Sequence, residues 1–282
     1  MKTNKVWFVT GASQGLGLIL VRELLARGYA VAATSRHLAQ LQQAVPPEPG
    51  RFLALHMDLH DEASVQQALD TTVRLLGGLD VVVNNAGYGQ LGALEELSAA
   101  EVQRNFEVNV FGLVHVLRHA TPYLRAQGHG QVFNVSSVGG FTGDFPGWGV
   151  YCATKFAVDG LTESYAAEVR AFGIRVTTVK PGYFRTGFLT AESLGRPAAP
   201  LAAYQAVRES QVQHDSLSGQ QPGDPVKAAA VIIAASEAAE APLHLFLGPD
   251  AYRMAARKIE AVQHDLQQWH PTATATDFAE AD

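Results

Sequence analysis

The sequence has little of what marks secreted, membrane-spanning or nucleic-acid-binding proteins. Its only cysteine is Cys152, so no intrachain disulfide can form and a reducing, cytoplasmic location is expected. The N-terminal residues lead straight into a strand-like segment, without the apolar core of a secretory leader. The most apolar run, residues 228–235, is too short to cross a bilayer. A net charge of −6 argues against nucleic acid or an anionic membrane as a partner.

Metal-ligand patterns are also scarce. His115 and His119 lie four residues apart and would share one face of a helix, but the sequence offers no evident third ligand. A packing surface is therefore the preferred interpretation, and no metal site is expected. Cys152 is interpreted as a small buried residue rather than a nucleophile.

Short β-branched or aromatic runs alternate with helical patterns along most of the chain. Strands are expected at residues 5–10, 30–35, 52–57, 79–85, 130–137, 174–181 and 243–248, and helices near 15–27, 38–45, 62–76, 99–126, 150–172 and 224–238. Most of the strands are apolar on both faces, as in a parallel sheet that helices cover on both sides. The alternation predicts right-handed crossovers and a doubly wound α/β fold. We expect one domain over residues 1–269.

Two segments depart from this alternation. Residues 183–223 form a long insertion, which predicts a lid or binding loop over a site, or a partly disordered segment. Near the C-terminus, apolar residues recur at spacings of three and four and predict a last helix with an apolar stripe: Ile259, Val262, Leu266 and Trp269. We expect this stripe to pack on the body of the protein, with a subunit contact as the alternative. Residues 270–282 are expected to form a flexible tail.

A glycine-rich turn follows the first expected strand. In V-T-G-A-S-Q-G-L-G-L, residues 9–18, the glycines are Gly11, Gly15 and Gly17. They would let the backbone turn sharply and approach a pyrophosphate at the N-terminus of the next helix. The spacing G-x-x-x-G-x-G differs from the G-x-G-x-x-G fingerprint, and a tight strand-to-helix turn is the plainer alternative. Its position after the first strand of a β-α chain favours a dinucleotide.

The end of the second expected strand bears on which dinucleotide is bound. An acidic residue here would hold a ribose 2′-hydroxyl, whereas an arginine accommodates a 2′-phosphate. The sequence T-S-R-H, residues 34–37, places Ser35 and then Arg36 at this point and no carboxylate. Arg36 could also be a solvated charge at a helix start, but it favours NADP(H) over NAD(H).

Polar residues follow the later strands. N-N-A-G, residues 84–87, ends the fourth strand and could be a simple turn. Asn109 is more informative, because it is an amide among apolar neighbours and a buried amide needs partners. Ser136 and Ser137 end the fifth strand at the sheet edge where ligands of such folds bind. Ser137 is the preferred active hydroxyl, with Ser136 satisfying backbone groups.

Tyr151 and Lys155 lie four apart in a helical pattern, so they share one face of the helix. A nearby ammonium favours the phenolate and lowers the pKa of the phenol. A free tyrosine has a pKa of about 10, and lowering it by ~3 units requires about 4 kcal/mol. An ammonium 4 Å away at an effective dielectric of ~20 supplies about that energy. This pair is therefore predicted to be a tuned acid–base catalyst.

Together these motifs resemble the short-chain dehydrogenase/reductase family, over about residues 5–250: TGxxxGxG, NNAG, a helix-borne Asn, Ser, YxxxK and PG, in that order. The resemblance implies a single Rossmann-type domain with strand order 3-2-1-4-5-6-7. It implies a catalytic tetrad of Asn109, Ser137, Tyr151 and Lys155, in which Asn109 anchors a water that supplies protons to Lys155. The residues it implies for cofactor binding are Gly11, Ser13, Gln14, Gly15, Leu16, Gly17, Ser35, Arg36, Asp58, Leu59, Asn85, Ala86, Gly87, Tyr151, Lys155, Pro181, Gly182 and Thr186. Gln14 departs from the basic residue that NADP-preferring relatives often carry.

The resulting hypothesis is reversible hydride transfer between NADP(H) and an alcohol/carbonyl pair, with NAD(H) left open as the cofactor. A non-catalytic NADP(H) sensor, or an isomerase, epimerase or lyase on the same fold, are the alternatives. Aromatic residues near the expected site suggest a bulky apolar ketone or aldehyde, or ordinary lid packing: Phe141, Phe145, Trp148, Tyr183, Phe184 and Phe188. The family resemblance implies a homo-oligomer, either a dimer or a tetramer.

Overall fold

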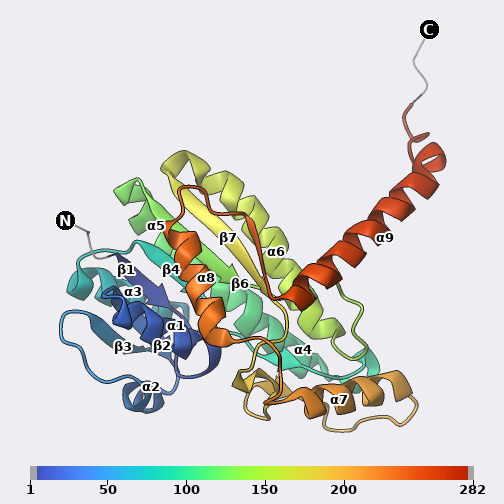
Figure 1. Cartoon of the computed structure of the whole chain (residues 1–282), viewed down its shortest axis with the longest axis horizontal. Coiled ribbons are helices and arrows are strands. Elements are labelled where there is room, and N and C mark those ends of the chain that lie inside the picture. The colour runs from blue at the N-terminus through green and yellow to red at the C-terminus, as the bar shows by residue number, and fades with distance from the viewer. Residues whose placement is uncertain (1–4, 279–282) are drawn as a thin grey trace.

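The computed structural model describes residues 5–278 and is built around a parallel sheet of seven strands, in the order β3-β2-β1-β4-β6-β7-β9 (Figure 1). These strands are β1 (Val6–Val9), β2 (Ala30–Ser35), β3 (Phe52–His56), β4 (Val81–Asn84), β6 (Gly130–Val135), β7 (Ile174–Pro181) and β9 (His244–Leu247). The two-residue strands β5 (Gly89–Gln90) and β8 (Leu194–Gly195) pair with each other in a separate small sheet. Without those two, the order is 3-2-1-4-5-6-7, so the predicted doubly wound fold is confirmed.

Helices cover both faces of the sheet. The α-helices of residues 5–278 are α1 (Gly15–Ala26), α2 (Leu38–Ala44), α3 (Glu62–Leu76), α4 (Ala99–Phe106), α5 (Gly112–Gln127), α6 (Gly149–Val169), α7 (Gln205–Leu217), α8 (Pro225–Glu237) and α9 (Pro249–Ala273). Short 3-10 turns occupy Leu94–Glu96, Val138–Gly140, Arg170–Phe172 and Gly187–Leu189. Within residues 5–278, no helix combines the length and apolarity needed to span a bilayer.

Successive residues of each central strand contribute to two different hydrophobic cores, because side chains alternate between the faces of a sheet. Trp7 and Val9 of β1 pack with α1, α2 and α8 on one face. Phe8 packs with α3, α5 and α6 on the other face. All three side chains are fully buried. This two-sided burial explains why the strands lack the polar alternation of an exposed sheet.

The predicted helix at 99–126 is interrupted in the structure. A π-helical turn at Glu107–Phe111 separates α4 from α5, and Asn109 lies within it. Such turns are rare and frequently occur at functional sites. The sequence did not predict this π-helical turn, because the residues on both sides of it form one continuous helical pattern.

The insertion at 183–223 folds along the carboxyl edge of the sheet. It contains the 3-10 turn at Gly187–Leu189, strand β8 and helix α7. The backbone of this segment is tied to the body through β5, where Gly89 N donates to Ser193 O at 2.9 Å and Leu91 N donates to Gly195 O at 2.9 Å. The sequence predicted a lid or loop here and did not predict α7.

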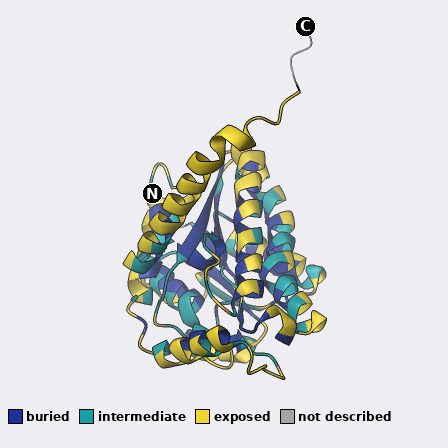
Figure 2. Ribbon diagram, turned by 90° about the vertical axis from the view of Figure 1, so that its right-hand side faces the viewer, coloured by how far each residue is buried: buried dark blue, intermediate teal, exposed yellow. Residues whose placement is uncertain are grey.

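Helix α9 corrects one expectation. Its apolar stripe was expected to pack on the body, but only the base of the helix does so, through the buried Ala251 and Ala255. Beyond that point α9 extends away from the sheet (Figure 1), and its residues are mostly exposed (Figure 2). The side chains of Ile259, Val262, Leu266 and Trp269 are exposed by 54%, 41%, 67% and 61%. Apolar periodicity reports a helix with one apolar face, and it carries no information on what covers that face.

The start of the expected C-terminal tail is helical. Helix α9 continues to Ala273, so residues 270–273 belong to it despite Pro271. Proline lacks a backbone N–H, and the helix ends within one turn of it. Residues 279–282 of the expected tail lie outside the described residues.

Candidate active site

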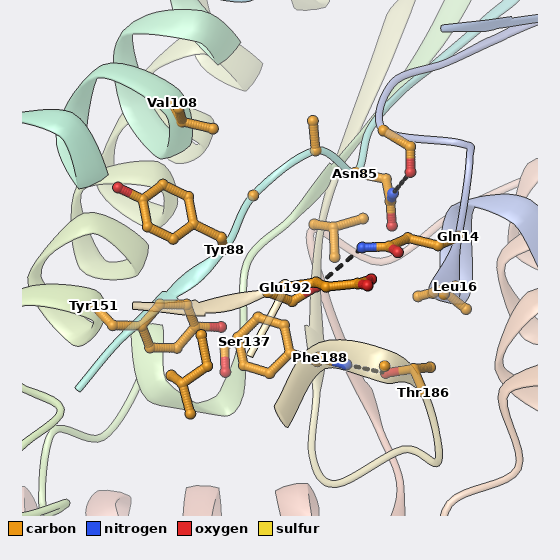
Figure 3. A pocket seen from close by; sticks show the side chains of 18 of the residues that line it. Gln14, Leu16, Asn85, Tyr88, Val108, Ser137, Tyr151, Thr186, Phe188 and Glu192 are labelled. Carbon is orange, nitrogen blue, oxygen red and sulfur yellow. Dashed lines mark hydrogen bonds between the residues drawn. The ribbon is translucent and has the colours of Figure 1, made fainter. Parts of the chain in front are cut away.

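A cavity of about 1010 Å³ opens at the carboxyl edge of the sheet (Figure 3). Its walls come from the segments that follow β1, β2, β4, β6 and β7, together with the 183–223 insertion. Open α/β sheets bind their ligands in this position. The volume is at the upper end of the usual range for small-molecule sites, which extends to about 1,000 Å³, so the cavity can hold a large ligand.

The glycine-rich turn forms one wall, and its glycines are required by geometry. Gly11 and Gly15 have φ values of +64° and +58°, a region that suits glycine. A Cβ on Gly11 would lie 2.7 Å from Ala86 Cα, and one on Gly17 would lie 2.5 Å from Asn85 Nδ2. The turn leads into α1, whose N-terminus has no capping side chain. Its first N–H groups therefore face the cavity as donors for an anion.

Asn85 and Thr10 hold this turn against the end of β4. The Asn85 side-chain amide donates to Thr10 O and Gly11 O, at 3.0 Å each. In return the Thr10 hydroxyl accepts from the backbone N–H groups of Asn85 and Ala86, also at 3.0 Å. The sequence pointed to Asn85 as a ribose-side contact, and in the structure its amide nitrogen is committed to the turn. Thr10 was not singled out, since a buried threonine at a strand end carries no distinct signal.

The end of β2 forms the far end of the cavity. Ser35 is buried and its hydroxyl accepts from His37 N at 2.9 Å, so it shapes the turn. Arg36 is exposed and lines the cavity. Asp58, at the end of β3, lines the same region and accepts from His60 N at 3.0 Å.

Most residues expected at the site line this one cavity. They are Gly11, Ser13, Gln14, Gly15, Leu16, Ser35, Arg36, Asp58, Leu59, Asn85, Ala86, Gly87, Ser137, Tyr151, Lys155, Pro181, Gly182 and Thr186. The two that do not are Gly17 and Asn109. Gly17 packs beneath the turn, and Asn109 lies behind the wall.

Asn109 acts as a bridge between backbone segments. Its Oδ1 accepts from Tyr88 N at 3.0 Å, and its Nδ2 donates to Tyr88 O at 3.0 Å and to Thr154 Oγ1 at 3.1 Å. The side chain is only 2% exposed, which agrees with the expectation of a buried amide with partners. Oδ1 lies 3.0 Å from where a Cβ on Gly87 would be, and Lys155 Nζ lies 3.4 Å from the same point. One lone pair of Oδ1 remains for a further donor near the lysine.

The two serines after β6 have different partners. Ser136 is buried and its hydroxyl donates to Lys155 O at 3.2 Å, as expected for a residue that satisfies backbone groups. The hydroxyl of Ser137 accepts from Gly139 N at 3.0 Å and faces the phenol of Tyr151 (Figure 3). The turn at Val138–Gly140 thus orients the Ser137 hydroxyl towards the cavity.

Tyr151 is 8% exposed and lies in an aromatic wall. Its ring centroid is 5.6 Å from that of Trp148 and 5.5 Å from that of Phe188. Burial raises the pKa of the Tyr151 phenol above its ordinary value of 10.0, and a hydrogen bond with Ser137 acts in the opposite direction. The direction of this shift is opposite to the lowered pKa that the sequence predicted. The phenol is protonated at neutral pH.

Lys155 explains this difference. Its ammonium donates to Val135 O at 2.9 Å and lies 5.8 Å from the centroid of the Tyr151 ring, so it is directed at the backbone of β6. Lys155 is 4% exposed, and burial lowers its pKa from 10.5 to about 8. The nearby carboxylate of Asp159 opposes this decrease.

The insertion adds residues that sequence reasoning missed. His214 of α7 packs against Trp148 with the ring centroids 4.8 Å apart and the rings tilted by 47°, and its Nε2 accepts from the hydroxyl of Tyr183 at 3.0 Å. Ser193 closes the opposite side, where its hydroxyl accepts from Gln14 Nε2 at 3.0 Å (Figure 3). Glu192 lies beside this contact and also lines the cavity. These pairs join residues that are 31 or more positions apart, so local sequence patterns could not reveal them.

The other candidates have ordinary partners. His115 Nδ1 lies 3.0 Å from Leu59 O, and His119 Nε2 lies 3.0 Å from Glu62 Oε1. No group of three or more His, Cys, Asp or Glu side chains suited to a metal occurs among residues 5–278. Cys152 is buried in the aromatic wall, and burial raises the pKa of its thiol to about 11, which leaves it protonated and a poor nucleophile.

Comparisons with known protein families, sequences and structures all point to one family. A model of the family described as short chain dehydrogenase matches residues 5–196. Oxidoreductase BOA17 of Botryotinia fuckeliana is 33% identical over 97% of this chain and 99% of its own length. A short-chain dehydrogenase structure from Streptomyces avermitilis is 36% identical with a TM-score of 0.89, covering 99% of this chain and 100% of that one. An alcohol dehydrogenase from Thermococcus sibiricus, solved with 5-hydroxy-NADP, is 26% identical with a TM-score of 0.70, covering 86% and 95%.

Proposed function

Because this chain belongs to the short-chain dehydrogenase/reductase family, we propose that it transfers hydride between NADP(H) and a carbonyl/alcohol pair, with Tyr151 as the proton donor or acceptor. The observation that carries this proposal is the phenol of Tyr151 facing the Ser137 hydroxyl inside a cavity large enough for a dinucleotide. The remaining site residues have supporting roles, which follow from their contacts.

The chain's own residues fit a nicotinamide dinucleotide. The turn at Gly11 and Gly15 presents backbone N–H groups without side-chain obstruction, and the uncapped start of α1 favours a pyrophosphate. Pro181, Gly182 and Thr186 follow β7 and line the end of the cavity nearer the catalytic residues. The bound cofactor would supply or accept the hydride, and the protein would orient it.

Arg36 supports NADP(H) as the preferred cofactor. It is the cation at the end of β2 that lines the cavity, and residues 34–37 contain no carboxylate that would repel a 2′-phosphate. The guanidinium can bind a phosphate through two hydrogen bonds. Gln14 is committed to Ser193 rather than to a phosphate, so discrimination would depend mainly on Arg36.

Proton transfer is assigned to Tyr151, with Ser137 beside it. The phenol is protonated at neutral pH, so it can donate its proton to the developing alkoxide in the reducing direction. The Ser137 hydroxyl would donate a hydrogen bond to the same oxygen and stabilise the charge that forms there. In the oxidising direction, Tyr151 must first lose its proton, and the ammonium of Lys155 would favour that step.

The walls around the catalytic phenol support a bulky, largely apolar substrate. Trp148, Phe188, Leu189 and Leu194 pack around Tyr151 in one hydrophobic cluster, and all of them line the cavity. Such a surface stabilises apolar groups by about 25 cal/mol per Å² that they bury. A ketone or aldehyde with a ring system or long alkyl group would fit this chemistry. A homo-oligomer and a cytoplasmic location remain predictions from the sequence.

The test is to follow the absorbance of reduced nicotinamide with a panel of ketones and aldehydes and with each cofactor. We expect net consumption of NADPH by the native protein. Tyr151→Phe should still bind NADPH but should lose turnover by at least about a hundredfold, the lower range for a general acid. Tyr123→Phe is the matched control, because that phenol bonds to Asp70 at the surface, away from the cavity. Cofactor binding without consumption would indicate a sensor, and product without net consumption would indicate an isomerase or lyase.

A further inference from the structure

A buried ion pair lies behind the catalytic lysine and outside the cavity. Lys180 of β7 and Asp159 of α6 are 0% and 6% exposed, and Lys180 Nζ is 3.0 Å from Asp159 Oδ2. Neither residue lines the cavity, so neither can touch a substrate or cofactor there. Removing two charges from water costs several kcal/mol per ion, and apolar residues of similar size are often at least as stabilising. Stability alone is therefore a weak reason for this pair.

Hydrogen bonds hold both members of the pair in place, while burial lowers the pKa of the Lys180 ammonium and the Asp159 carboxylate opposes that decrease. Thr178 Oγ1 donates to Asp159 Oδ1 at 2.7 Å, so both carboxylate oxygens have a donor. The Lys180 ammonium also donates to Thr178 Oγ1 at 3.1 Å and lies 3.3 Å from His244 Nδ1. The Asp159 carboxylate is thus the negative partner of a buried ion pair, and Lys180 and Thr178 hold its two oxygens in place.

This charge lies one helical turn from Lys155. Residues four apart on a helix are neighbours on the same face, so Asp159 follows Lys155 along α6. Burial favours the neutral amine of Lys155, and the Asp159 carboxylate opposes that effect. Because both groups are buried, solvent and salt screen their interaction less than they screen a surface pair.

The other titratable groups around Lys155 contribute less. Tyr151, Cys152 and Tyr183 line the same cavity as Lys155, and burial raises the pKa of each, so they are uncharged at neutral pH. Glu163 of α6 and His244 of β9 lie beyond the ion pair, with side chains that are 55% and 42% exposed.

Asp250 of α9 lies on the far side of Tyr183, where its carboxylate accepts from Tyr183 N at 2.6 Å. Asp159 is therefore the buried negative charge that acts on Lys155.

We propose that Asp159 is a positioning residue that keeps Lys155 in its ammonium form, and that Lys180 limits how strongly the Asp159 carboxylate acts on Lys155. The functional part of this proposal rests on the roles proposed above for Tyr151 and Lys155. The two partners then have opposite effects on the same group. Without the carboxylate, Lys155 loses its proton more readily. Without Lys180, Lys155 becomes the remaining buried cation near Asp159 and holds its proton more tightly.

Two variants test this difference in sign: Asp159→Asn and Lys180→Met, which have nearly the same shapes as the native residues. The direct measurement is a pH titration of the Lys155 side-chain ¹⁵N resonance, assigned by its loss in Lys155→Met, which needs no substrate. A neighbouring opposite charge shifts a pKa by about 1 unit or more. We expect the Lys155 pKa to fall by about 1 unit in Asp159→Asn and to rise by a comparable amount in Lys180→Met.

The pH–rate profile of alcohol oxidation is the second measurement. The pH at which the oxidation rate levels off should move in the same direction as the Lys155 pKa in each variant. Glu163→Gln is the matched control, because it removes a carboxylate one turn further along α6 that is exposed to solvent. It should leave both measurements unchanged. The double variant Asp159→Asn/Lys180→Met removes both charges together and leaves no unpaired buried charge, so it can be measured if a single variant is unstable. We expect the Lys155 pKa in the double variant to be lower than in the native protein.

The proposal would be overturned if the Lys155 pKa moved in the same direction in both single variants. It would also be overturned if the Lys155 pKa did not change in Asp159→Asn and in the double variant. The ion pair would then be a structural element only. This outcome differs from a failure of the proposed function. If the resonance shifts in opposite directions while Tyr151→Phe retains full turnover, the electrostatic coupling stands and the assignment of Tyr151 is wrong.

Discussion

Replacing Asn109 by leucine should destabilise the protein by about 2–4 kcal/mol, although the new side chain has a similar size. Tyr88 N–H would lose its acceptor, and leaving such a group unpaired costs about 1–3 kcal/mol. The bond to Thr154 would also be lost, at about 1 kcal/mol net. Tyr88 C=O would be less affected, because it also accepts from Asn105 Nδ2 at 3.1 Å. The free energy of unfolding from urea denaturation measures the sum.

Val110→Leu is the control for this variant. Val110 lies in the same π-helical turn and is only partly buried, and its side chain has no polar group to lose. We expect a change within about 0.5 kcal/mol, which is usual for substitutions away from special features. If Asn109→Leu were as stable as this control, Asn109 would not bridge Tyr88 and Thr154, and the account of this wall of the site would be wrong.

Three further predictions concern the cofactor, the pH dependence and the turn after β7. Arg36→Leu should raise the KM for NADPH by about 5- to 30-fold, because an exposed charge-assisted hydrogen bond contributes about 1–2 kcal/mol. The KM for NADH should be nearly unchanged. Equal effects on the two KM values would contradict a contact between Arg36 and the 2′-phosphate. Because the pKa of Tyr151 is raised and that of Lys155 is about 8, the rate of alcohol oxidation should rise from pH 6 to pH 8 and level off above pH 8. Carbonyl reduction should persist at pH 6, because Tyr151 is protonated there. Stopped-flow rates in both directions check this. Gly182→Ala would place a Cβ 2.2 Å from Asp250 Oδ2 and displace the acceptor of Tyr183 N, so the melting temperature should fall by several degrees; an unchanged melting temperature would show that α9 can move aside.

Local signals were enough to predict the sheet and several helix ends. Helix α3 lies within the predicted bounds, because Asp61 caps its first turn by accepting from Ala63 N, and Gly77 ends it with φ at +85°. The seven strands were recognised because they are short β-branched or aromatic runs, most of them apolar on both faces as in parallel strands that helices cover. Their order followed from the family resemblance, since spacing along the chain does not determine which strands are neighbours.

The remaining features depend on contacts that are distant in the sequence. The break at Glu107–Phe111 is supported by Asn109 bonding to Tyr88, a residue on another segment. The pKa of Tyr151 was misjudged because the helical spacing to Lys155 shows proximity but not direction. Lys155 donates to Val135 O, and burial then dominates the pKa of the phenol. The outward course of α9 likewise depends on tertiary contacts, because only its first residues, including Ala251 and Ala255, are buried against the rest of the protein.

The measurement that tests the central claim most directly is isotope transfer from NADPH carrying deuterium at the C4 position that donates the hydride. A ketone from the panel would be reduced by the native protein, and the alcohol would be analysed by mass spectrometry and NMR. The account predicts one deuterium on the carbinol carbon for each NADPH consumed, and almost no labelled alcohol with Tyr151→Phe. Product without deuterium, or labelled alcohol formed equally well by Tyr151→Phe, would contradict it.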